Sequence, residues 1–485
     1  MQNIVKEFSG MDELVFGTDG WRDVIGDRFT FVNVGRVAQG YADHLIESEV
    51  SRVIVGYDTR FNGRLFAQRV AEVLATNGLE VLISDGPIPA PVLSFAVVHH
   101  GAGGGVMLTA SHNPPSYNGF KLKGAYGGTA TDNIYQDVAR RVTTTRPEDI
   151  RREQRKQCFE HLDIKESYFR HLSQLVDLDV ISTLHGTVIH DAMGGAGGVW
   201  IAEFIKFLGL ENIRILGRRN SPDPMFSGVN PEPIPTNLVS LTTELSIEPS
   251  RNIMFATATD GDSDRLGLVL PGGVYFNSHQ IFSVLVDLFA RRGATGRVVK
   301  SFSVSRVVER LAHARGLDVL ETRVGFKYIV EAMLQEDVLV GGEESGGIGV
   351  TGHIPERDGI ANSLLLIEAV GRAGVPLNEI FESIQREVDW VHAYDRLDLR
   401  LTTNLNKDLA MSSLRQLSNS FLGRAINSVE RRDGIKINLE GGAWLLVRAS
   451  GTEPLLRIYC EAQTVGEVAQ ILDGAKQFFS TVSNN

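Results

Sequence analysis

A serine in the segment "TASHNPPSYNGFK", residues 109–121, stands among groups that suit phosphoryl chemistry. Ser111 offers a hydroxyl, which is a weak nucleophile unless a neighbour activates it. His112 follows it directly, and the cationic Lys121 ends the segment. Because Ser-x-Asn-Pro is also ordinary turn chemistry, the serine defines a site only if another part of the chain can bind a phosphate or a metal.

An acidic segment, "DGDSDR", supplies the metal candidate. Its aspartates stand at alternate positions: Asp260, Asp262 and Asp264. Alternate side chains of an extended segment point the same way, so three carboxylates would converge and require a cation. Oxygen ligands suit Mg2+, whereas an EF-hand would need Gly and Glu where Arg265 and Pro271 stand. We therefore predict a Mg2+ site with a phosphoryl oxygen on Ser111 as a further ligand; the alternative is a solvated acidic turn.

Two further segments offer groups for a phosphate and a sugar. In "RASGTEPLLR", residues 448–457, two arginines supply forked donors, hydroxyls flank a glycine, and backbone N–H groups can approach an anion. The alternative is a hairpin with an incidental arginine. In "GGEESGG", residues 341–347, carboxylates and a hydroxyl could accept from sugar hydroxyls, although a charged turn explains this pattern equally well.

The segments between these loops alternate between patterns that are typical of strands and of helices. Short β-branched runs such as 52–58 precede amphipathic stretches such as 63–78, and the rhythm recurs until about residue 390. This predicts three similar α/β domains with mixed, largely parallel sheets, followed by a C-terminal α+β domain. The expected domains are residues 1–160 with the serine loop, 161–256 with the acidic loop at its end, 257–385 with the "GGEESGG" loop, and 386–485 with the "RASGTEP" loop.

Composition limits the possible partners and compartments. The chain has 485 residues and a formal charge of −11, which argues against a basic surface that binds nucleic acid. Cys158 and Cys460 lie far apart, so no disulfide framework or zinc ribbon is indicated. The sequence shows no secretory signal and no apolar run that would span a bilayer. We therefore expect a cytoplasmic protein without a membrane partner, and the oligomeric state stays open.

Together the loops resemble those of the α-D-phosphohexomutase family. They occur in that family's order and at similar spacing, and "FGTDGWR", residues 16–22, resembles its N-terminal signature. The resemblance covers nearly the whole chain. It implies a heart-shaped, four-domain enzyme around a central cleft, with Mg2+, a phosphoserine at Ser111, a hexose phosphate substrate and glucose 1,6-bisphosphate as activator.

The same resemblance implies a role for each candidate residue. Lys121 would be the general acid/base and His112 a helper on the phosphate side, and we expect nearby cations to lower the pKa of Lys121. Arg22 and Arg265 would steady the transferring phosphate. The remaining candidates would bind substrate: Glu343 and Ser345 the sugar hydroxyls, Lys327, His353 and Arg357 the phosphosugar, and Arg448, Ser450, Gly451, Thr452 and Arg457 the non-reacting phosphate.

Within the family, the chain resembles the phosphoglucomutases most. Glu344 and the segment "HIPERDG", residues 353–359, match their pattern, and Gly347 stands where the dual-specificity enzymes carry His. The resemblance thus implies interconversion of glucose 1-phosphate and glucose 6-phosphate through a glucose 1,6-bisphosphate intermediate. The alternatives are a glucose 1,6-bisphosphate synthase, a phosphomannomutase or a phosphoglucosamine mutase, and, outside enzymes, a sugar-phosphate sensor.

Overall fold

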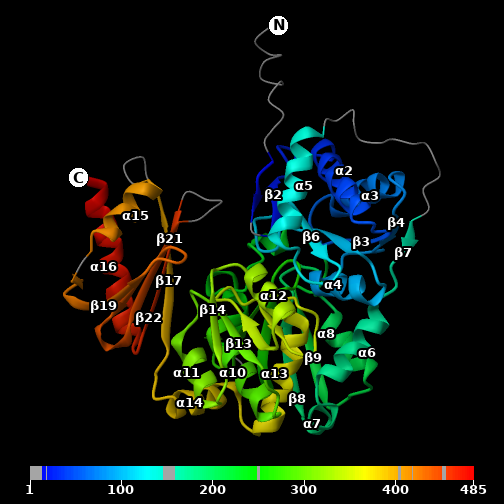
Figure 1. The fold of residues 1–485 in the computed structure, drawn as a ribbon. Coiled ribbons are helices and arrows are strands. Elements are labelled where there is room, and N and C mark those ends of the chain that lie inside the picture. The colour runs from blue at the N-terminus through cyan, green and yellow to red at the C-terminus, as the bar shows by residue number, and fades with distance from the viewer. Residues whose placement is uncertain are drawn as a thin grey trace.

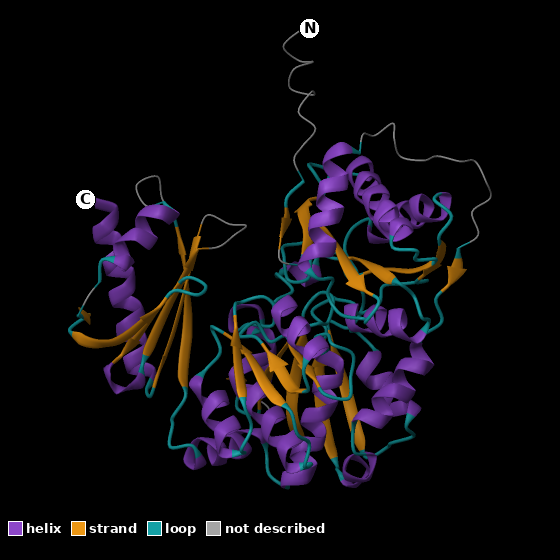
Figure 2. Cartoon of the chain, viewed as in Figure 1, coloured by secondary structure: helices purple, strands orange, loops and turns teal. Residues whose placement is uncertain are grey.

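The computed structural model shows four domains, three of them α/β and the last α+β, as the sequence predicts (Figure 1). It describes residues 14–17, 19–145, 159–247, 252–401, 406–417, 419–449 and 455–484. Domain I lies above domains II and III in this view, and domain IV stands beside them with its helices turned outward. Helices lie on both faces of the sheets of the first three domains (Figure 2).

Domain I has a mixed sheet in the order β1-β2-β6-β5-β3-β4-β7. Strands β3, β4, β5 and β7 run parallel, whereas β1, β2 and β6 form an antiparallel edge. The strands are β1 (Phe16–Gly17), β2 (Gly20–Val24), β3 (Arg52–Tyr57), β4 (Glu80–Ile83), β5 (Gly104–Leu108), β6 (Tyr117–Gly124) and β7 (Glu160–His161). The helices are α2 (Phe31–Glu47), α3 (Gly63–Thr76), α4 (Ala90–His99) and α5 (Asp132–Thr144).

The helices of domain I divide between two hydrophobic cores. Apolar residues of α2, α3 and α5 pack with the sheet into a core of their own. Helix α4 is apolar around its circumference, as a helix buried on all sides must be, and its residues join a second core shared with domains II and III. Domain I is therefore fixed to its neighbours through α4.

Domain II repeats the pattern with a sheet in the order β12-β11-β10-β8-β9, in which β8, β9 and β10 run parallel. Its elements are α6 (Lys165–Leu175), α7 (Leu178–Thr183), β8 (Gly186–Asp191), α8 (Trp200–Phe207), β9 (Ile213–Arg218), α9 (Val239–Ile247), β10 (Ile253–Thr259), β11 (Leu266–Leu270) and β12 (Val274–Phe276).

The boundary expected after residue 256 falls inside β10, and the sheet continues to Phe276. The boundary expected after residue 160 likewise falls inside β7 of the first sheet. The reason for both differences is that the pairing partners of these strands lie earlier in the chain.

Domain III has a sheet in the order β14-β13-β15-β16, again with one antiparallel edge. Its elements are α10 (Ser278–Arg291), β13 (Arg297–Ser301), α11 (Arg306–Ala314), β14 (Val319–Thr322), α12 (Phe326–Gln335), β15 (Val338–Gly342), β16 (Ile348–Val350), α13 (Gly359–Ala373) and α14 (Leu377–Glu387).

In the described part of the chain no single helix has the length and apolar character to cross a bilayer. Helices α13 and α14 meet that test only as a pair, by length and composition, and they are bent by 74°.

Domain IV is built on a six-stranded antiparallel sheet in the order β17-β22-β21-β20-β19-β18. Its elements are β17 (Ala393–Arg400), α15 (Lys407–Arg415), β18 (Ser420–Phe421), β19 (Arg424–Glu430), β20 (Ile435–Leu439), β21 (Trp444–Ala449), β22 (Leu455–Ala462) and α16 (Val465–Asn484). Helices α15 and α16 cover one face of the sheet, and their apolar residues form a separate core with it.

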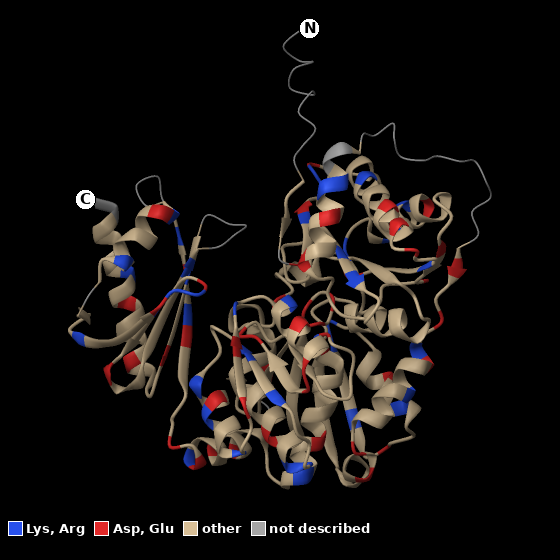
Figure 3. Cartoon of the chain, in the orientation of Figure 1, with Lys and Arg blue, Asp and Glu red and all other residues tan. Residues whose placement is uncertain are grey.

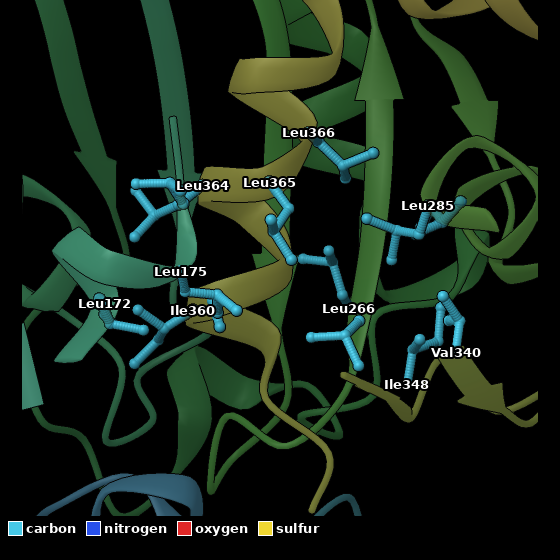
Figure 4. Packing of buried hydrophobic residues seen from close by; sticks show 14 of the residues in the cluster. Leu172, Leu175, Leu266, Leu285, Val340, Ile348, Ile360, Leu364, Leu365 and Leu366 are labelled. Atoms are coloured by element: carbon cyan, nitrogen blue, oxygen red, sulfur yellow. The ribbon is translucent and has the colours of Figure 1, made fainter. Parts of the chain in front are cut away.

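Helix α13 is the centre of the core that joins domains II and III (Figure 4). Every residue from Ile360 to Ile367 is buried, because the helix packs on all of its sides. Leu364, Leu365 and Leu366 point away from the helix in different directions, and Ile360 near its start lies beside Leu172 and Leu175 of α6. Burial of each such side chain contributes about 1.5–3 kcal/mol, so domains II and III form one packed unit.

Candidate active site

The three α/β domains present their candidate loops at equivalent places. In each sheet the loop joins a parallel strand to its antiparallel neighbour: β5 to β6 for the serine loop, β10 to β11 for the acidic loop, and β15 to β16 for the "GGEESGG" loop. The carboxyl ends of parallel strands are where open α/β sheets bind ligands. Basic and acidic residues gather where these loops meet, between domain I and the two domains below it (Figure 3).

The serine loop brings Ser111 against the acidic loop of domain II. The Ser111 Oγ donates to Asp260 Oδ2 at 2.6 Å, and the side chain is buried. Ser111 has a φ of +53°, a left-handed conformation that non-glycine residues adopt at a cost of about 1–3 kcal/mol. The two loops are 149 residues apart in the sequence, so the fold creates this contact.

The aspartates of the acidic loop form a buried cluster in which one carboxylate oxygen from each lies within 4.8 Å of the others. The segment is a loop between β10 and β11, as predicted, and it turns back on itself because the backbone N–H groups of Asp264 and Arg265 donate to Asp260 Oδ1 at 3.0 and 3.1 Å. Burial, reinforced by the charges of the other two aspartates, raises the pKa of Asp260 well above its ordinary value.

This cluster fits a hard divalent cation. Asp262 Oδ1 and Asp264 Oδ1 are buried and have no hydrogen-bond partner among the described residues. Buried unpaired carboxylate oxygens are costly, and all-oxygen donor sets of this kind suit Mg2+. The backbone N–H of Gly359, at the start of α13, donates to Ser263 O at 3.0 Å, so the central core helix begins on this loop.

Lys121 on β6 completes the charge balance of the cluster. Its Nζ lies 2.8 Å from Asp262 Oδ2, 3.1 Å from Asp264 Oδ2 and 3.0 Å from Asp19 Oδ2. Burial works to lower the pKa of Lys121, but these three carboxylates outweigh it and raise the pKa above the ordinary lysine value. The expected lowering of this pKa is therefore wrong, because the nearest groups are carboxylates and not cations.

Asp19 is a site residue that the sequence reasoning missed. Besides Lys121, it pairs with Arg22 at 2.9 Å and with Arg357 at 3.2 Å. Arg357 in turn lies 2.8 Å from Asp264 Oδ2. The available signal was the position of Asp19 inside "FGTDGWR", three residues before Arg22. Asp19 thus links the N-terminal segment to domain III and to the acidic loop.

His112 lies among cations from three domains. Its Nδ1 is 3.5 Å from Ser111 Oγ. Burial, followed by the charges of Arg265, Arg22, Arg457 and Lys121, lowers the pKa of His112 well below its ordinary value. These groups come from domains I, II and IV, so the predicted catalytic residues surround one place. A neutral imidazole and a ring of fixed cations suit the binding of an anionic substrate.

The side chains of the "GGEESGG" loop point in two directions. Glu343 Oε1 accepts from the Gly325 N–H at 2.8 Å, and burial raises the pKa of Glu343 despite Arg357 and Arg265. The buried Ser345 Oγ has no partner among the described residues. Glu344 instead faces domain IV, where it accepts from the Tyr394 hydroxyl at 2.9 Å and lies 3.6 Å from Arg396.

Two predicted substrate residues have other partners. Both ring nitrogens of the buried His353 are engaged, Nδ1 with His171 at 2.7 Å and Nε2 with Asp358 at 2.9 Å. The structure therefore does not bring His353 to the site, since no ring nitrogen is left for a substrate. Lys327 Nζ donates to Asp132 at 2.6 Å, which ties α12 to α5 of domain I.

The "RASGTEP" loop is only partly described. Arg448 and Arg457 face each other across β21 and β22, and Arg448 Nη2 lies 3.0 Å from Asp433. The predicted ligands Ser450, Gly451 and Thr452 lie outside the described residues. The Val324 N–H donates to Asp433 Oδ2 at 2.8 Å, so the base of this loop contacts domain III.

Comparisons with known proteins find matches to all four domains of the chain. Models of the phosphoglucomutase/phosphomannomutase family match in order: alpha/beta/alpha domain I at residues 13–149, domain II at 166–273, domain III at 277–387 and the C-terminal domain at 403–476. A crystal structure from Thermus thermophilus, provisionally assigned as a phosphomannomutase, aligns with a TM-score of 0.86 and 42% identity over 97% of this chain and 99% of that chain.

Two curated relatives extend the comparison. A phosphoglucomutase/phosphomannomutase of Thermococcus kodakarensis is 26% identical, covering 95% of this chain and 97% of its own. A protein of Methanothermobacter thermautotrophicus, provisionally assigned as a phosphoglucosamine mutase, is 29% identical, covering 96% of this chain and 98% of its own. The fold and these relatives define an isomerase that transfers phosphoryl groups on hexose phosphates. The chain belongs to the phosphoglucomutase/phosphomannomutase family, as its resemblance to the phosphohexomutases implied.

Proposed function

We propose that the protein is a phosphoglucomutase that interconverts glucose 1-phosphate and glucose 6-phosphate. The observation that carries this proposal is the 2.6 Å contact between Ser111 Oγ and Asp260, inside a buried cluster of carboxylates and cations. The three relatives differ in the sugar that they are named for. Support for glucose comes from Glu344, which follows the phosphoglucomutase pattern, and from Gly347, which stands where the dual-specificity enzymes carry His.

In the proposed cycle, Ser111 carries a phosphoryl group that passes to a hydroxyl of glucose phosphate. The bond between phosphorus and Ser111 Oγ breaks as the bond to the sugar oxygen forms, and the resulting glucose 1,6-bisphosphate reorients and returns its other phosphoryl group to Ser111. Asp260, Asp262 and Asp264 would hold Mg2+, with the Ser111 phosphoryl oxygen as a further ligand. When bound, Mg2+ would supply Lewis-acid stabilisation of phosphoryl oxygens.

The surrounding side chains position the substrate and balance its charge. Arg22, Arg265 and His112 would face the transferring phosphoryl group, and Lys121 would serve as general acid/base. Glu343 and Ser345 would accept from sugar hydroxyls, and Arg357 would contact the phosphosugar. The second phosphate would be held by domain IV through Arg448, Arg457 and the loop between them. Such phosphoryl transfer depends mainly on positioning and on charge stabilisation.

A sugar-phosphate panel tests this proposal. The purified protein would be assayed with glucose, mannose and glucosamine 1-phosphates and with Mg2+, in the presence and absence of glucose 1,6-bisphosphate as activator. We expect the largest kcat/KM for glucose 1-phosphate and a phosphorylated Ser111 peptide by mass spectrometry. Ser111→Ala should abolish turnover while leaving the circular dichroism spectrum unchanged. Full activity of that variant, or accumulation of free bisphosphate as the main product, would contradict the mutase assignment.

A further inference from the structure

Arg60, in the loop between β3 and α3, lies beneath the serine loop with its side chain fully buried. Its Nη1 donates to the carbonyl oxygens of Pro114 and Tyr117, both at 2.8 Å. Its Nη2 donates to those of Ser111 and Asn113, both at 2.7 Å. The remaining donor, Nε, lies 3.2 Å from Asp58 Oδ2. A guanidinium has five N–H donors, and every one of them therefore has a partner here.

Asp58 extends this network to the other side of Ser111. Its Oδ2 accepts from the Thr109 hydroxyl at 2.6 Å, and Thr109 Oγ1 accepts from the Ser111 N–H at 2.8 Å. Arg60 thus holds the carbonyl of Ser111, and Asp58 holds its N–H through Thr109. Both backbone polar groups of the serine are thus fixed by side chains, and the β3–α3 loop supplies Arg60 for the carbonyl and Asp58 as the anchor of Thr109.

Such bracing is what the backbone of Ser111 requires. A left-handed non-glycine residue persists only when its surroundings over-determine it, and Ser111 has a φ of +53°. The bracing also reaches domain II, because the Phe226 ring of that domain lies 4.8 Å from the Arg60 guanidinium. A Cβ placed on Gly261 would lie 2.6 Å from Ser111 O and 3.3 Å from that same ring. The serine loop, Arg60 and the acidic loop are therefore in close contact.

We propose that Asp58, Arg60 and Thr109 form a positioning clamp that holds Ser111 in its left-handed conformation and so directs its hydroxyl at the aspartate cluster. This inference rests on the proposed phosphoryl-carrying role of Ser111. The clamp touches no substrate group and acts only through the backbone of the serine loop. Its loss therefore lowers kcat, while sugar-phosphate binding by the other domains is retained.

The sharpest test removes one hydroxyl from the clamp. Thr109→Val keeps the shape of the side chain but breaks the link between Asp58 and the Ser111 N–H, whereas Thr109→Ser keeps that link. A misplacement of about 1 Å at a reacting group can lower a rate by about 10²-fold. We expect kcat of Thr109→Val to fall by about that factor with KM changed less than about threefold, and Thr109→Ser to restore most of kcat. Phosphorylation of Ser111 by glucose 1,6-bisphosphate should slow in parallel.

Two controls separate positioning from folding. Thr145→Val removes another buried hydroxyl of domain I, which donates to Arg141 O at 2.9 Å, and it should leave kcat unchanged. Circular dichroism and thermal unfolding of all variants report the folded fraction. A kcat of Thr109→Val that equals the wild-type value, or that falls only in proportion to the folded fraction, would overturn the clamp.

The result is distinguishable from a failure of the proposed function. If Ser111→Ala retains turnover, the phosphoserine mechanism fails and the clamp with it. If Ser111→Ala is inactive while Thr109→Val is fully active, only the clamp fails. Arg60→Lys gives a second measurement, because a lysine keeps the charge beside Asp58 but supplies three donors instead of five. The clamp requires Arg60→Lys to lower kcat as well, and an unchanged kcat in this folded variant would count against it.

Discussion

The contact between domains II and III differs in kind from the contact between domains III and IV. The first is a continuous apolar core around α13. The second is mainly polar: the buried Glu461 of β22 accepts from His392 Nδ1 at 2.8 Å, from the Arg306 N–H at 3.0 Å and from the Ser305 hydroxyl. It also accepts from two tryptophans, Trp390 and Trp444. A small cluster of Phe302, Trp444, Leu446 and Tyr459 supplies the apolar part of this contact.

This difference shows which contacts hold each domain in place. Apolar burial is non-directional and spread over many residues, so the joining of domains II and III, which carry the acidic loop and the "GGEESGG" loop, does not depend on any single residue. A polar network is stable only when each member is satisfied. The placement of domain IV, which carries Arg448 and Arg457, therefore depends in large part on the groups around Glu461.

The largest expected effect comes from removing Glu461. Glu461→Ala leaves several buried donors without an acceptor, and each buried donor left unsatisfied costs about 1–3 kcal/mol. We expect the free energy of unfolding of domain IV to fall by about 3 kcal/mol or more and KM for glucose 1-phosphate to rise. Denaturant unfolding and steady-state kinetics measure the two effects. The exposed Glu440→Ala in the same domain is the control, and an unchanged KM in Glu461→Ala would separate this network from substrate binding.

A core substitution in α13 should act on the other contact. Leu365→Ala removes a fully buried side chain, and such changes cost about 2–5 kcal/mol. The loss should appear in the main unfolding transition and not in KM at low temperature. Ile247→Ala, at a position that is 72% exposed, should change the free energy of unfolding by less than about 0.5 kcal/mol. Equal losses in the two variants would refute the shared core.

Lys436, in the polar contact between domains III and IV, should make the free energy of unfolding depend on pH. This side chain donates to Phe302 O at 3.0 Å and lies over the Trp444 ring. Burial, reinforced by Lys300, lowers the pKa of Lys436 to about 8 from 10.5. Between these values the unfolded chain holds a proton that the folded chain has lost, so the free energy of unfolding rises with pH. Relative to Lys436→Met, the wild type should gain about 1–3 kcal/mol from pH 8 to pH 10, and a flat difference would contradict this pKa.

The smallest expected effect concerns the ion pairs of Arg396. It lies 3.6 Å from Glu344 of domain III and 3.8 Å from Glu232 of domain II. These ion pairs are long and join side chains that are only partly buried, so we take their contribution as at most about 1 kcal/mol. Arg396→Gln should therefore change the free energy of unfolding by less than that, and the change should shrink at high salt. A loss as large as that of Glu461→Ala would make these ion pairs part of the main attachment.

The sequence was sufficient for the fold class and for the residues that lie next to each other in a loop. Strand and helix patterns predict the domains. The serine and acidic loops can be recognised because the residues that suit their chemistry are nearly consecutive in the sequence. Long-range partners could not be predicted in this way. Arg60 looks like an ordinary loop residue until its contacts with four carbonyls are seen, and the His171 that engages His353 lies 182 residues away.

The predicted charge state and domain boundaries differ from the structure for the same reason. The pKa of Lys121 depends on Asp19, Asp262 and Asp264, which only the folded chain brings to it. The second domain extends beyond residue 256 because β10, β11 and β12 pair with strands that precede them. The attachment of domain IV is likewise invisible in the sequence, since Glu461 and Arg306 are 155 residues apart.

The start of α13 on the acidic loop has a practical consequence. Through Gly359, the same helix that organises the interior of domains II and III also supports the turn that holds the three aspartates. A substitution that moves the first turn of α13 would therefore alter both resistance to heat and the aspartate turn that we propose as a Mg2+ site. Changing resistance to heat alone would have to use positions further along the helix, such as Leu365.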